Sequence, residues 1–426
     1  MTRRKALIMA GGRGERLAPI TDGVPKPLVP VAGRAVVSHA LARLYGAGIG
    51  NAALTLGYGG EKIKEYFAER GTEGVALEYF EEETPLGTAG GAAEARGYFD
   101  SDFIALGGDV VFDFDVSPAF EFHKKAGALA TVIVTRCDEP CRFGVVVFDK
   151  SGRITSFSEK PTWRRVHGDT VSTGMYILSP RIFDFIRPGR FSDFARDVFP
   201  NLLGGALYAY EADGYFCDIG TPASYLKTNA DAAAGKICGV AGSPVSPRAE
   251  VSDTAKIKSS VIMDGASVGA GATVENSIVC ENAAVGRGAT VMNAIVAAGK
   301  TVPENATAHP TRGIEEFFSR AALSAAKAKI REAVGETADE FVPDGAKTYA
   351  VTGKTTAPFG SAKTLGELVR RGADVREEGV RLIFDGGTAD ICCVDADTVE
   401  ITVRASTGER AAELYDYAKN GVKKLF

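Results

Sequence analysis

The sequence concentrates glycines and two separated cations in one short stretch, AGGRGERLAPITDGVPKPL at residues 10–28, directly after an apolar run. Backbone amides of glycines can close on phosphate oxygens because no side chain keeps the anion away. Arg16 and Lys26 could neutralise charge on such a ligand, and Pro25 and Pro27 restrict the backbone around the lysine. The stretch therefore predicts a phosphate-binding loop, although a glycine turn with solvated cations would also fit these residues taken alone.

Two better-known phosphate loops are excluded by their spacing. The dinucleotide-binding pattern G-x-G-x-x-G needs a third glycine where Leu17 stands. The P-loop pattern G-x-x-x-x-G-K-[S/T] does not occur in residues 10–28. It also fails at TGKTT, residues 352–356, because Thr348 stands where its first glycine should be. The loop must therefore be interpreted with the help of residues elsewhere in the chain.

Two aspartates are predicted to stand at strand ends. Asp109 directly follows the apolar run FIALGG, and Asp218 lies in GYFCDIGTPASYL between an aromatic residue and a glycine. A carboxylate at the end of an apolar strand is costly unless it is hydrated or binds a metal. Either aspartate alone could be an ordinary turn residue, but the pair together with Arg16 and Lys26 suits a divalent ion that bridges phosphates.

The elements that must position these residues alternate along the first part of the chain. Helical periodicity marks VVSHALARLYGAG and GEKIKEYFAER, and the first of these ends at a glycine. Short apolar or β-branched runs between the helices predict strands: ALIMA, VALEYF, FIALGG, ATVIVT, GVVVF and GMYIL. The alternation predicts an α/β domain over residues 1–238, with a mainly parallel sheet and helices on both faces. Ligands of such sheets bind at the carboxyl ends of the strands.

A 17-residue repeat begins after the Gly/Pro/Ser-rich stretch 239–248. Aliphatic residues recur in three columns: Val245, Ile262, Val279 and Val296; Val251, Val268, Val285 and Val302; Ile257, Val274 and Val291. Three aligned columns predict three short parallel sheets, stacked coil on coil. The pattern over residues 239–310 resembles the hexapeptide-repeat left-handed β-helix, with one rung of each coil shortened by a residue.

The character of the chain changes again after the repeat. Residues 311–336 include GIEEFFSRAALSAAKAKIREAVG, an amphipathic pattern that predicts a helical linker or a cap for the open end of the coils. Residues 337–426 predict a small α+β domain. Its strands are expected at GVRLIF, ADICCV and TVEITVRA, with a closing helix at GERAAELYDYAKNGVKKL.

Composition narrows the possible function classes. The net charge of −5 argues against partnership with nucleic acid or a membrane surface, since either favours a concentrated basic face. The apolar run ALIMA is too short for the core of a signal peptide, and no run approaches a membrane-spanning length. The seven cysteines show neither a disulfide framework nor paired zinc spacing, so we expect reduced thiols and a cytoplasmic location.

An ordered set of motifs carries a family resemblance. Residues 5–230 resemble the sugar-1-phosphate nucleotidylyltransferases through AGGRGERLAP…PKPL, PLGTAGG, GGD, RFGVV, EKP, STGMYIL, DVFPNLL and DIGTPASYL. The resemblance implies a Rossmann-like α/β fold, in agreement with the strand and helix pattern. It also implies that the phosphate of a sugar 1-phosphate attacks the α-phosphorus of a nucleoside triphosphate and that pyrophosphate leaves. Catalysis would then consist chiefly of positioning and charge neutralisation.

The same resemblance implies roles for individual residues. Arg16, Lys26 and Asp109 would be catalytic, with Arg16 on the departing pyrophosphate and Lys26 at the α-phosphate. Asp109 and Asp218 would hold Mg²⁺. The nucleotide would be bound by Ala10, Gly11, Gly12, Gly14, Pro85, Gly87 and Thr88, and the sugar phosphate by Gly144, Glu159, Lys160, Ser172 and Gly174.

Departures from the family pattern bear on the substrates. Glu15 stands where many members carry threonine, and Phe216 replaces a frequent tryptophan. Ser172 stands where the family often has an asparagine that touches the sugar, so the identity of the sugar stays open. The PLGTAGG form and the trailing domain favour GTP and mannose 1-phosphate by resemblance to the mannose-1-phosphate guanylyltransferases. Glucose 1-phosphate with UTP, dTTP or ATP is the alternative.

Three further functions compete with a plain transferase. An acyltransferase would need a catalytic histidine in the coils, but His309 lies just beyond the last one. The chain's last 90 or so residues resemble the C-terminal domain of phosphohexomutases. They carry CCVDADTVE in place of the phosphate-binding loop, so we predict no mutase activity and a role in oligomerisation or regulation. A regulatory subunit that binds nucleotide sugars without turnover stays open. We expect a homo-oligomer, because exposed faces of β-helices commonly pair subunits.

Overall fold

A computed structural model describes residues 4–137, 139–311 and 314, and from residue 340 onward the ranges 340–344, 348–357, 361–370, 373–376, 378–384, 387–396, 398–405 and 408–423. The chain forms two compact units. The first comprises Met1–Glu121, Met175–Ser192 and Asp213–Glu332; the second comprises Phe122–Gly174, Asp193–Ala212 and Ala333–Phe426. These two units are defined by compactness alone. They do not test the boundaries of the four segments predicted from the sequence, which stay a prediction. The helix predicted within 311–336 lies outside the described residues.

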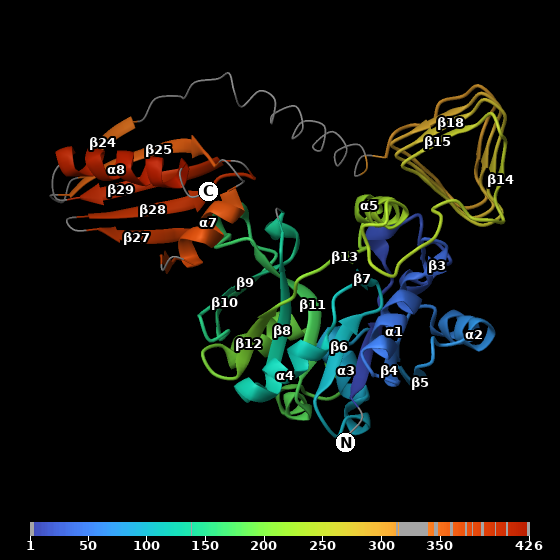
Figure 1. Cartoon of the computed structure of the whole chain (residues 1–426), viewed down its shortest axis with the longest axis horizontal. Helices are drawn as coiled ribbons and strands as arrows, with labels where there is room; N and C mark the ends of the chain where they lie inside the picture. Colours follow the sequence, from blue (N-terminus) through green and yellow to red (C-terminus); the bar gives the residue numbers. More distant parts are fainter. Residues whose placement is uncertain are drawn as a thin grey trace. The chain divides into compact units, whose positions relative to one another are not determined.

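The first unit contains the predicted mainly parallel sheet (Figure 1). Parallel pairings run β6–β1–β4–β5, and the last residues of β11 pair antiparallel with β6. The central strands are apolar on both faces, as helix-covered parallel strands must be, and Leu7 and Ile8 are fully buried. The bounds are β1 Lys5–Ala10, β4 Asn51–Leu56, β5 Ala76–Glu81, β6 Phe103–Gly107, β11 Thr170–Leu178, α1 Val36–Gly46, α2 Gly60–Arg70 and α3 Gly87–Glu94.

Short strands, short helices and one α-helix complete the part of this unit that precedes the coils. Strand β7 (Val110–Phe112) continues from β6 and pairs antiparallel with β13 (Phe216–Asp218). Helix α5 (Pro222–Ala233) follows β13, and Thr221 caps it by accepting a hydrogen bond from the Ser224 amide. The remaining short elements are η1 Glu15–Leu17, η2 Lys26–Leu28, β2 Pro30–Val31 and β3 Arg34–Ala35.

The 17-residue repeat folds as predicted into stacked coils of short parallel strands (Figure 1). Partners in adjacent coils are 17 residues apart: Val251 pairs with Val268, Val268 with Val285, and Val285 with Val302. Stacked strands, three sheets and an aliphatic interior agree with the predicted left-handed β-helix. The sheets are β14 Glu250–Val251, β17 Ser267–Val268, β20 Ala284–Val285 and β23 Thr301–Val302; β15 Lys256–Lys258, β18 Thr273–Glu275 and β21 Thr290–Met292; β16 Val261–Ile262, β19 Ile278–Val279 and β22 Ile295–Val296.

Serines and asparagines at equivalent places turn the coils. The Ser277 amide donates to Ser260 Oγ at 3.0 Å, and the Ala294 amide donates to Ser277 Oγ at 3.1 Å. Asn276 and Asn293 adopt left-handed backbone conformations, with φ of 49° and 53°, which asparagine tolerates better than most residues. His309 lies beyond the last bridge of the coils, between Thr290 and Thr307. The coils therefore offer no histidine for acyl transfer.

One sheet of the β-helix packs against the segment that carries Arg16 and Lys26. Met263 and Cys280 of the coils are buried with Leu17, Ile20 and Val29 in one hydrophobic cluster. Helix α5 closes the same segment: Tyr225 Oη donates to the Pro30 carbonyl at 2.7 Å, and Asn229 Oδ1 accepts from the Ala32 amide at 2.9 Å. The phosphate loop is therefore supported from behind by two elements far away in the sequence.

The second unit combines further strands with the C-terminal domain. Strand β8 pairs parallel with β12, β9 pairs antiparallel with β10, and Val171 at the beginning of β11 pairs with Val145 of β9. Thr173 Oγ1 donates to the Ile133 carbonyl at 2.8 Å, so β8 and β11 are joined as well. The bounds are α4 Ser117–Ala126, β8 Ala130–Arg136, β9 Gly144–Phe148, β10 Ile154–Glu159 and β12 Leu207–Glu211. The short helices of this unit are η4 Pro140–Arg142, η5 Trp163–Arg165, η7 Phe194–Val198 and η8 Phe199–Leu202, whereas η3 Arg96–Tyr98 and η6 Pro180–Phe185 belong to the first unit.

The C-terminal part forms the predicted small α+β domain. All of its strand pairs are antiparallel, in the order β24–β25–β29–β28–β27–β26. Sequence reasoning found β27, β28, β29 and the closing helix, but it missed β24, β25, β26 and α7. The bounds are β24 Glu340–Asp344, β25 Thr348–Thr356, α7 Ser361–Arg370, β26 Asp374–Val375, β27 Val380–Phe384, β28 Gly387–Cys393, β29 Thr398–Ala405 and α8 Gly408–Lys423. Among the described residues, no helix has the length and apolar character needed to cross a membrane.

The β-helix core yields a stability prediction. Ile262 is 1% exposed and lies between coils, so Ile262→Ala should cost about 2–5 kcal/mol of unfolding free energy. Thermal unfolding monitored by circular dichroism should show a lower midpoint than in the unsubstituted protein. Met292→Ala is the control, because Met292 lies in the same coils but is 42% exposed. Equal midpoints for the two variants would contradict the coil packing described above.

Candidate active site

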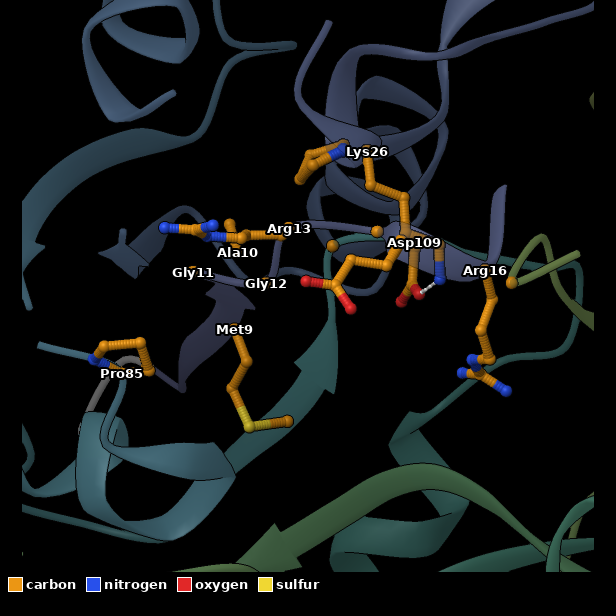
Figure 2. A pocket seen from close by; sticks show the side chains of 14 residues that line it. Met9, Ala10, Gly11, Gly12, Arg13, Arg16, Lys26, Pro85 and Asp109 are labelled. Atoms are coloured by element: carbon orange, nitrogen blue, oxygen red, sulfur yellow. Dashed lines mark hydrogen bonds and ion pairs between the residues drawn. The ribbon is translucent and has the colours of Figure 1, made fainter. Parts of the chain in front are cut away.

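The predicted phosphate loop lines a cavity of about 610 Å³ at the carboxyl ends of β1 and β6 (Figure 2). β1 ends at Ala10 and β6 at Gly107; the Gly108 amide donates to the Met9 carbonyl at 3.0 Å and so fixes the two strand ends side by side. The structure brings together in this cavity eight residues predicted from the sequence: Ala10, Gly11, Gly12, Gly14, Arg16, Lys26, Pro85 and Asp109. Six further residues line the cavity but were not predicted from the sequence as binding residues: Met9, Arg13, Glu15, Pro27, Gly108 and Gly220.

Lys26 bridges the two predicted metal-binding aspartates. Its Nζ forms a short ion pair with Asp109 and lies 3.3 Å from Asp218 Oδ1. The aspartates meet because β7 and β13 pair with Val110 opposite Asp218, and because the Ile219 amide donates to the Asp109 carbonyl at 3.2 Å. The Lys26 side chain is only 12% exposed. Residues 26, 109 and 218 therefore form one charged triad at the edge of the cavity.

The triad shifts the titration of its members. Burial alone lowers the pKa of Lys26, but attraction to Asp109 and Asp218 outweighs it, so the pKa is raised above its ordinary value. Burial and the neighbouring Asp109 raise the pKa of Asp218, while Lys26 and Arg16 oppose that rise. Lys26 therefore stays protonated and supplies a permanent positive charge beside two converging carboxylates.

The glycine loop is held in shape by close backbone approaches. Gly14 has a φ of 69°, and a Cβ there would lie 3.1 Å from the Lys26 Cβ. A Cβ on Gly57 would lie 2.7 Å from the Gly11 carbonyl oxygen, which the Tyr58 amide also contacts at 3.2 Å. The glycines after β1 and β4 are therefore required by the packing of one loop against the other. Figure 2 shows Arg13 and Arg16 extending from this loop in different directions.

Glu82 lies beside the glycine loop and was not predicted as a site residue from the sequence. Its Oε2 accepts a hydrogen bond from the Leu86 amide at 3.0 Å. A Cβ on Gly11 would lie 3.0 Å from its Oε1, and a Cβ on Gly91 only 2.3 Å from it. Burial raises the pKa of Glu82, and hydrogen bonds from Leu86 and Thr55 oppose the rise. The carboxylate therefore closes the turn that contains Pro85 and lies close to Gly11 of the glycine loop.

Gly87 and Thr88 stand at the beginning of α3 and do not line the cavity, although Pro85 does. A Cβ on Gly87 would lie 2.6 Å from the Ser192 carbonyl oxygen, and its φ of 74° is left-handed. The amides of Ala89 and Gly90 donate to that same oxygen at 2.9 and 3.1 Å. Packing against Ser192 therefore explains Gly87 without a ligand.

The five predicted sugar-phosphate residues lie in the second unit. Gly144 is paired with Glu159 across β9 and β10, and a Cβ on Gly144 would lie 2.9 Å from Glu159 Oε2. Lys160 follows with a left-handed φ of 45°, and its Nζ lies 3.3 Å from Glu159 Oε1. These three residues form one cluster. Ser172 and Gly174 are on β11, where Ser172 Oγ accepts from the Gly174 amide at 3.2 Å.

The aspartates fit a hard divalent cation. Their carboxylate oxygens converge on one point, now contacted by Lys26 Nζ. No group of three or more His, Cys, Asp or Glu side chains among the described residues could hold a metal. Two converging carboxylates suit a divalent cation that is also held by the phosphates of a ligand.

The chain belongs to the nucleotidyl transferase family, whose model matches residues 5–235, more than half of its length. A second model, described as GlmU-like C-terminal hexapeptide, matches residues 222–309. Nucleotidyltransferases of this kind generally use a divalent metal, in agreement with the paired aspartates.

The curated relatives are mannose-1-phosphate guanylyltransferases. A mannose-1-phosphate guanylyltransferase catalytic subunit beta from Dictyostelium discoideum is 34% identical over 228 residues, which are 52% of this chain and 62% of the relative. A mannose-1-phosphate guanylyltransferase from Mycobacterium tuberculosis is 34% identical over 247 residues, 56% of this chain and 66% of the relative. The chain thus spans less than two thirds of the length of these relatives. The solved structure of HddC from Yersinia pseudotuberculosis is 27% identical, with a TM-score of 0.48, over 54% of this chain and 99% of HddC.

Glu82 provides a test of how the turn that contains Pro85 is held. Glu82→Ala removes the acceptor of the Leu86 amide, and an unsatisfied buried amide costs about 1–3 kcal/mol. We expect the affinity for a nucleoside triphosphate, measured by calorimetry, to fall about tenfold. Glu83→Ala is the matched control, because Glu83 is an exposed neighbouring carboxylate. If both variants bind the nucleoside triphosphate as the unsubstituted protein does, Glu82 does not position the turn.

Proposed function

We propose that this chain transfers a nucleotidyl group from a nucleoside triphosphate to a sugar 1-phosphate, giving a nucleotide sugar and pyrophosphate. The observation that carries the proposal is the Lys26 triad at the edge of a glycine-lined cavity. Similarity to relatives named mannose-1-phosphate guanylyltransferases favours GTP and mannose 1-phosphate as substrates, with GDP-mannose as the product. Glucose 1-phosphate with UTP, dTTP or ATP is the alternative, and a subunit that senses nucleotide sugars without turnover is the rival class.

In this reaction the protein itself forms no covalent bond to either substrate. A phosphate oxygen of the sugar 1-phosphate forms a bond to the α-phosphorus, the bond from the α-phosphorus to the bridging oxygen of the β-phosphate breaks, and pyrophosphate leaves with those electrons. The attacking oxygen is already anionic, so no general base is needed. The amides of Gly11, Gly12 and Gly14 hold the triphosphate. Rate enhancement then comes from placing the reactants and neutralising their charge.

The two cations take separate phosphates. Arg16 lines the cavity and neutralises the departing pyrophosphate, while Lys26 neutralises the α-phosphate. Its raised pKa keeps Lys26 charged throughout. Asp109 and Asp218 would hold Mg²⁺, which when bound supplies positive charge between the reacting phosphates. In its absence the two carboxylates hold the Lys26 ammonium in place.

The remaining predicted residues bind the rest of each substrate. Ala10 and Pro85 line the nucleotide cavity, and Gly87 and Thr88 follow in the same turn. In the second unit, Glu159 takes sugar hydroxyls and Lys160 the sugar phosphate. Gly144 and Gly174 let the sugar approach the backbone, and Ser172 stands where the sugar binds.

Two properties of the whole protein remain proposals. All seven cysteines are free thiols, which supports a reducing, cytoplasmic setting. We also propose a homo-oligomer, and the only support is that exposed faces of β-helices commonly pair subunits.

A substrate matrix tests the reaction and its specificity. GTP, ATP, UTP, CTP and dTTP are each combined with mannose, glucose and galactose 1-phosphates in the presence of Mg²⁺, and pyrophosphate release is measured. We expect turnover with at least one pair and the fastest with GTP and mannose 1-phosphate. Release from no pair would overturn the transferase proposal.

Asp109→Asn distinguishes a transferase from a sensor. Loss of one carboxylate of the pair should lower turnover about 100-fold or more, while binding of the nucleotide sugar stays measurable. Removing divalent metal with EDTA should abolish turnover, and Mg²⁺ should restore it. Asp213→Asn is the control, because Asp213 is exposed and lies before β13. Unchanged turnover in Asp109→Asn would contradict the role of the triad.

A further inference from the structure

The hydrophobic core of the C-terminal domain includes residues from outside that domain. Val166 is fully buried in the same cluster as Leu365, Val380 and Ile391. Trp163 and Cys141, which are partly buried, pack against this cluster as well. The domain therefore closes its core on a short stretch of the preceding part of the second unit.

Polar and backbone contacts extend the same interface. Arg164 Nη1 lies 3.7 Å from Glu378 Oε2 and 3.6 Å from Glu400 Oε1. Its side chain is 48% exposed, so these ion pairs orient the contact more than they stabilise it. A Cβ on Gly168 would lie 3.2 Å from the Cα of Gly366 in α7. Apolar burial and a close backbone approach therefore fix the position of the domain on this stretch.

This stretch is next to the predicted sugar-phosphate residues in the sequence. Strand β10 ends at Glu159, Lys160 follows it, and Trp163 begins η5 three residues later. The Lys160 amide donates to the Phe143 carbonyl at 3.0 Å, and Phe143 directly follows η4, which contains Cys141. The chain on both sides of the Lys160–Phe143 hydrogen bond is therefore anchored to the C-terminal core.

We infer that the C-terminal domain is a positioning element for the sugar-phosphate residue Lys160, acting through Trp163 and Val166. The inference rests on the proposed function, which assigns Lys160 to the phosphate of the sugar. The left-handed backbone of Lys160, with a φ of 45°, is unfavourable for a residue with a side chain and needs support from its surroundings. The docked domain supplies that support without contributing any group to the reaction.

The first arm of the test measures kinetics in the full chain. Trp163→Ala should raise the KM for the sugar 1-phosphate about tenfold and leave the KM for the nucleoside triphosphate within about twofold. On a Lys160→Ala background, the same substitution should cause no further rise, because the two residues act through one contact. Ile383→Ala is the control, since Ile383 is 69% exposed on the same domain. Equal rises in both KM values, or additive effects with Lys160→Ala, would overturn the inference.

A second arm does not depend on turnover. Amide hydrogen exchange of residues 159–168 should accelerate about tenfold in Trp163→Ala and in Arg164→Glu, while exchange in the β-helix stays unchanged. Unchanged exchange at 159–168 would overturn the docking role even in an active enzyme. Wild-type protein that turns over no substrate pair would instead overturn the proposed function, and the exchange data would still decide whether the domain holds this stretch. If Trp163→Ala does not fold, Arg164→Glu takes its place in the exchange experiment. Thermal unfolding of Arg164→Glu shows whether that variant is folded.

Discussion

The ion triad of Lys26, Asp109 and Asp218 is the interaction on which the rest of the candidate site depends. Two carboxylates that converge in a partly buried place repel each other, and one ammonium group balances them. Under the proposed function, a divalent cation would replace that balance when phosphates enter and would leave Lys26 available for the α-phosphate. The glycines that line the cavity leave their backbone amides open to an anion beside this triad.

Different elements of the fold hold the different residues of the candidate site in place. The β7–β13 pairing brings Asp218 to Asp109, and the β-helix and α5 pack behind the segment that carries Lys26. Glu82 closes the turn that contains Pro85 by accepting a hydrogen bond from the Leu86 amide, and its carboxylate lies close to Gly11. In the second unit, the C-terminal core encloses the stretch after Lys160. Domains that contribute no predicted catalytic group therefore still support the segments that carry them.

Local pattern and repeat period were readable from the sequence, whereas tertiary neighbours were not. The β-helix could be predicted because stacked coils impose a 17-residue register that no other arrangement repeats, and Asp109 was placed correctly because an apolar strand ends just before it. The role of Glu82 was missed because its partners Gly11 and Gly91 are near it only in space. The assignment of Gly87 to the nucleotide stays a prediction, and the close packing of its backbone on Ser192 could not be read from the sequence.

Binding of Mn²⁺ in the presence of GTP, followed by electron paramagnetic resonance of the free ion, tests the proposed metal role of the triad most directly. Asp109→Asn and Asp218→Asn should each weaken Mn²⁺ binding about tenfold or more, because each removes one of two protein carboxylates. Lys26→Met should not weaken it, since Lys26 competes with the metal for the same oxygens. Mn²⁺ binding by Asp218→Asn equal to that of the unsubstituted protein would contradict the shared site.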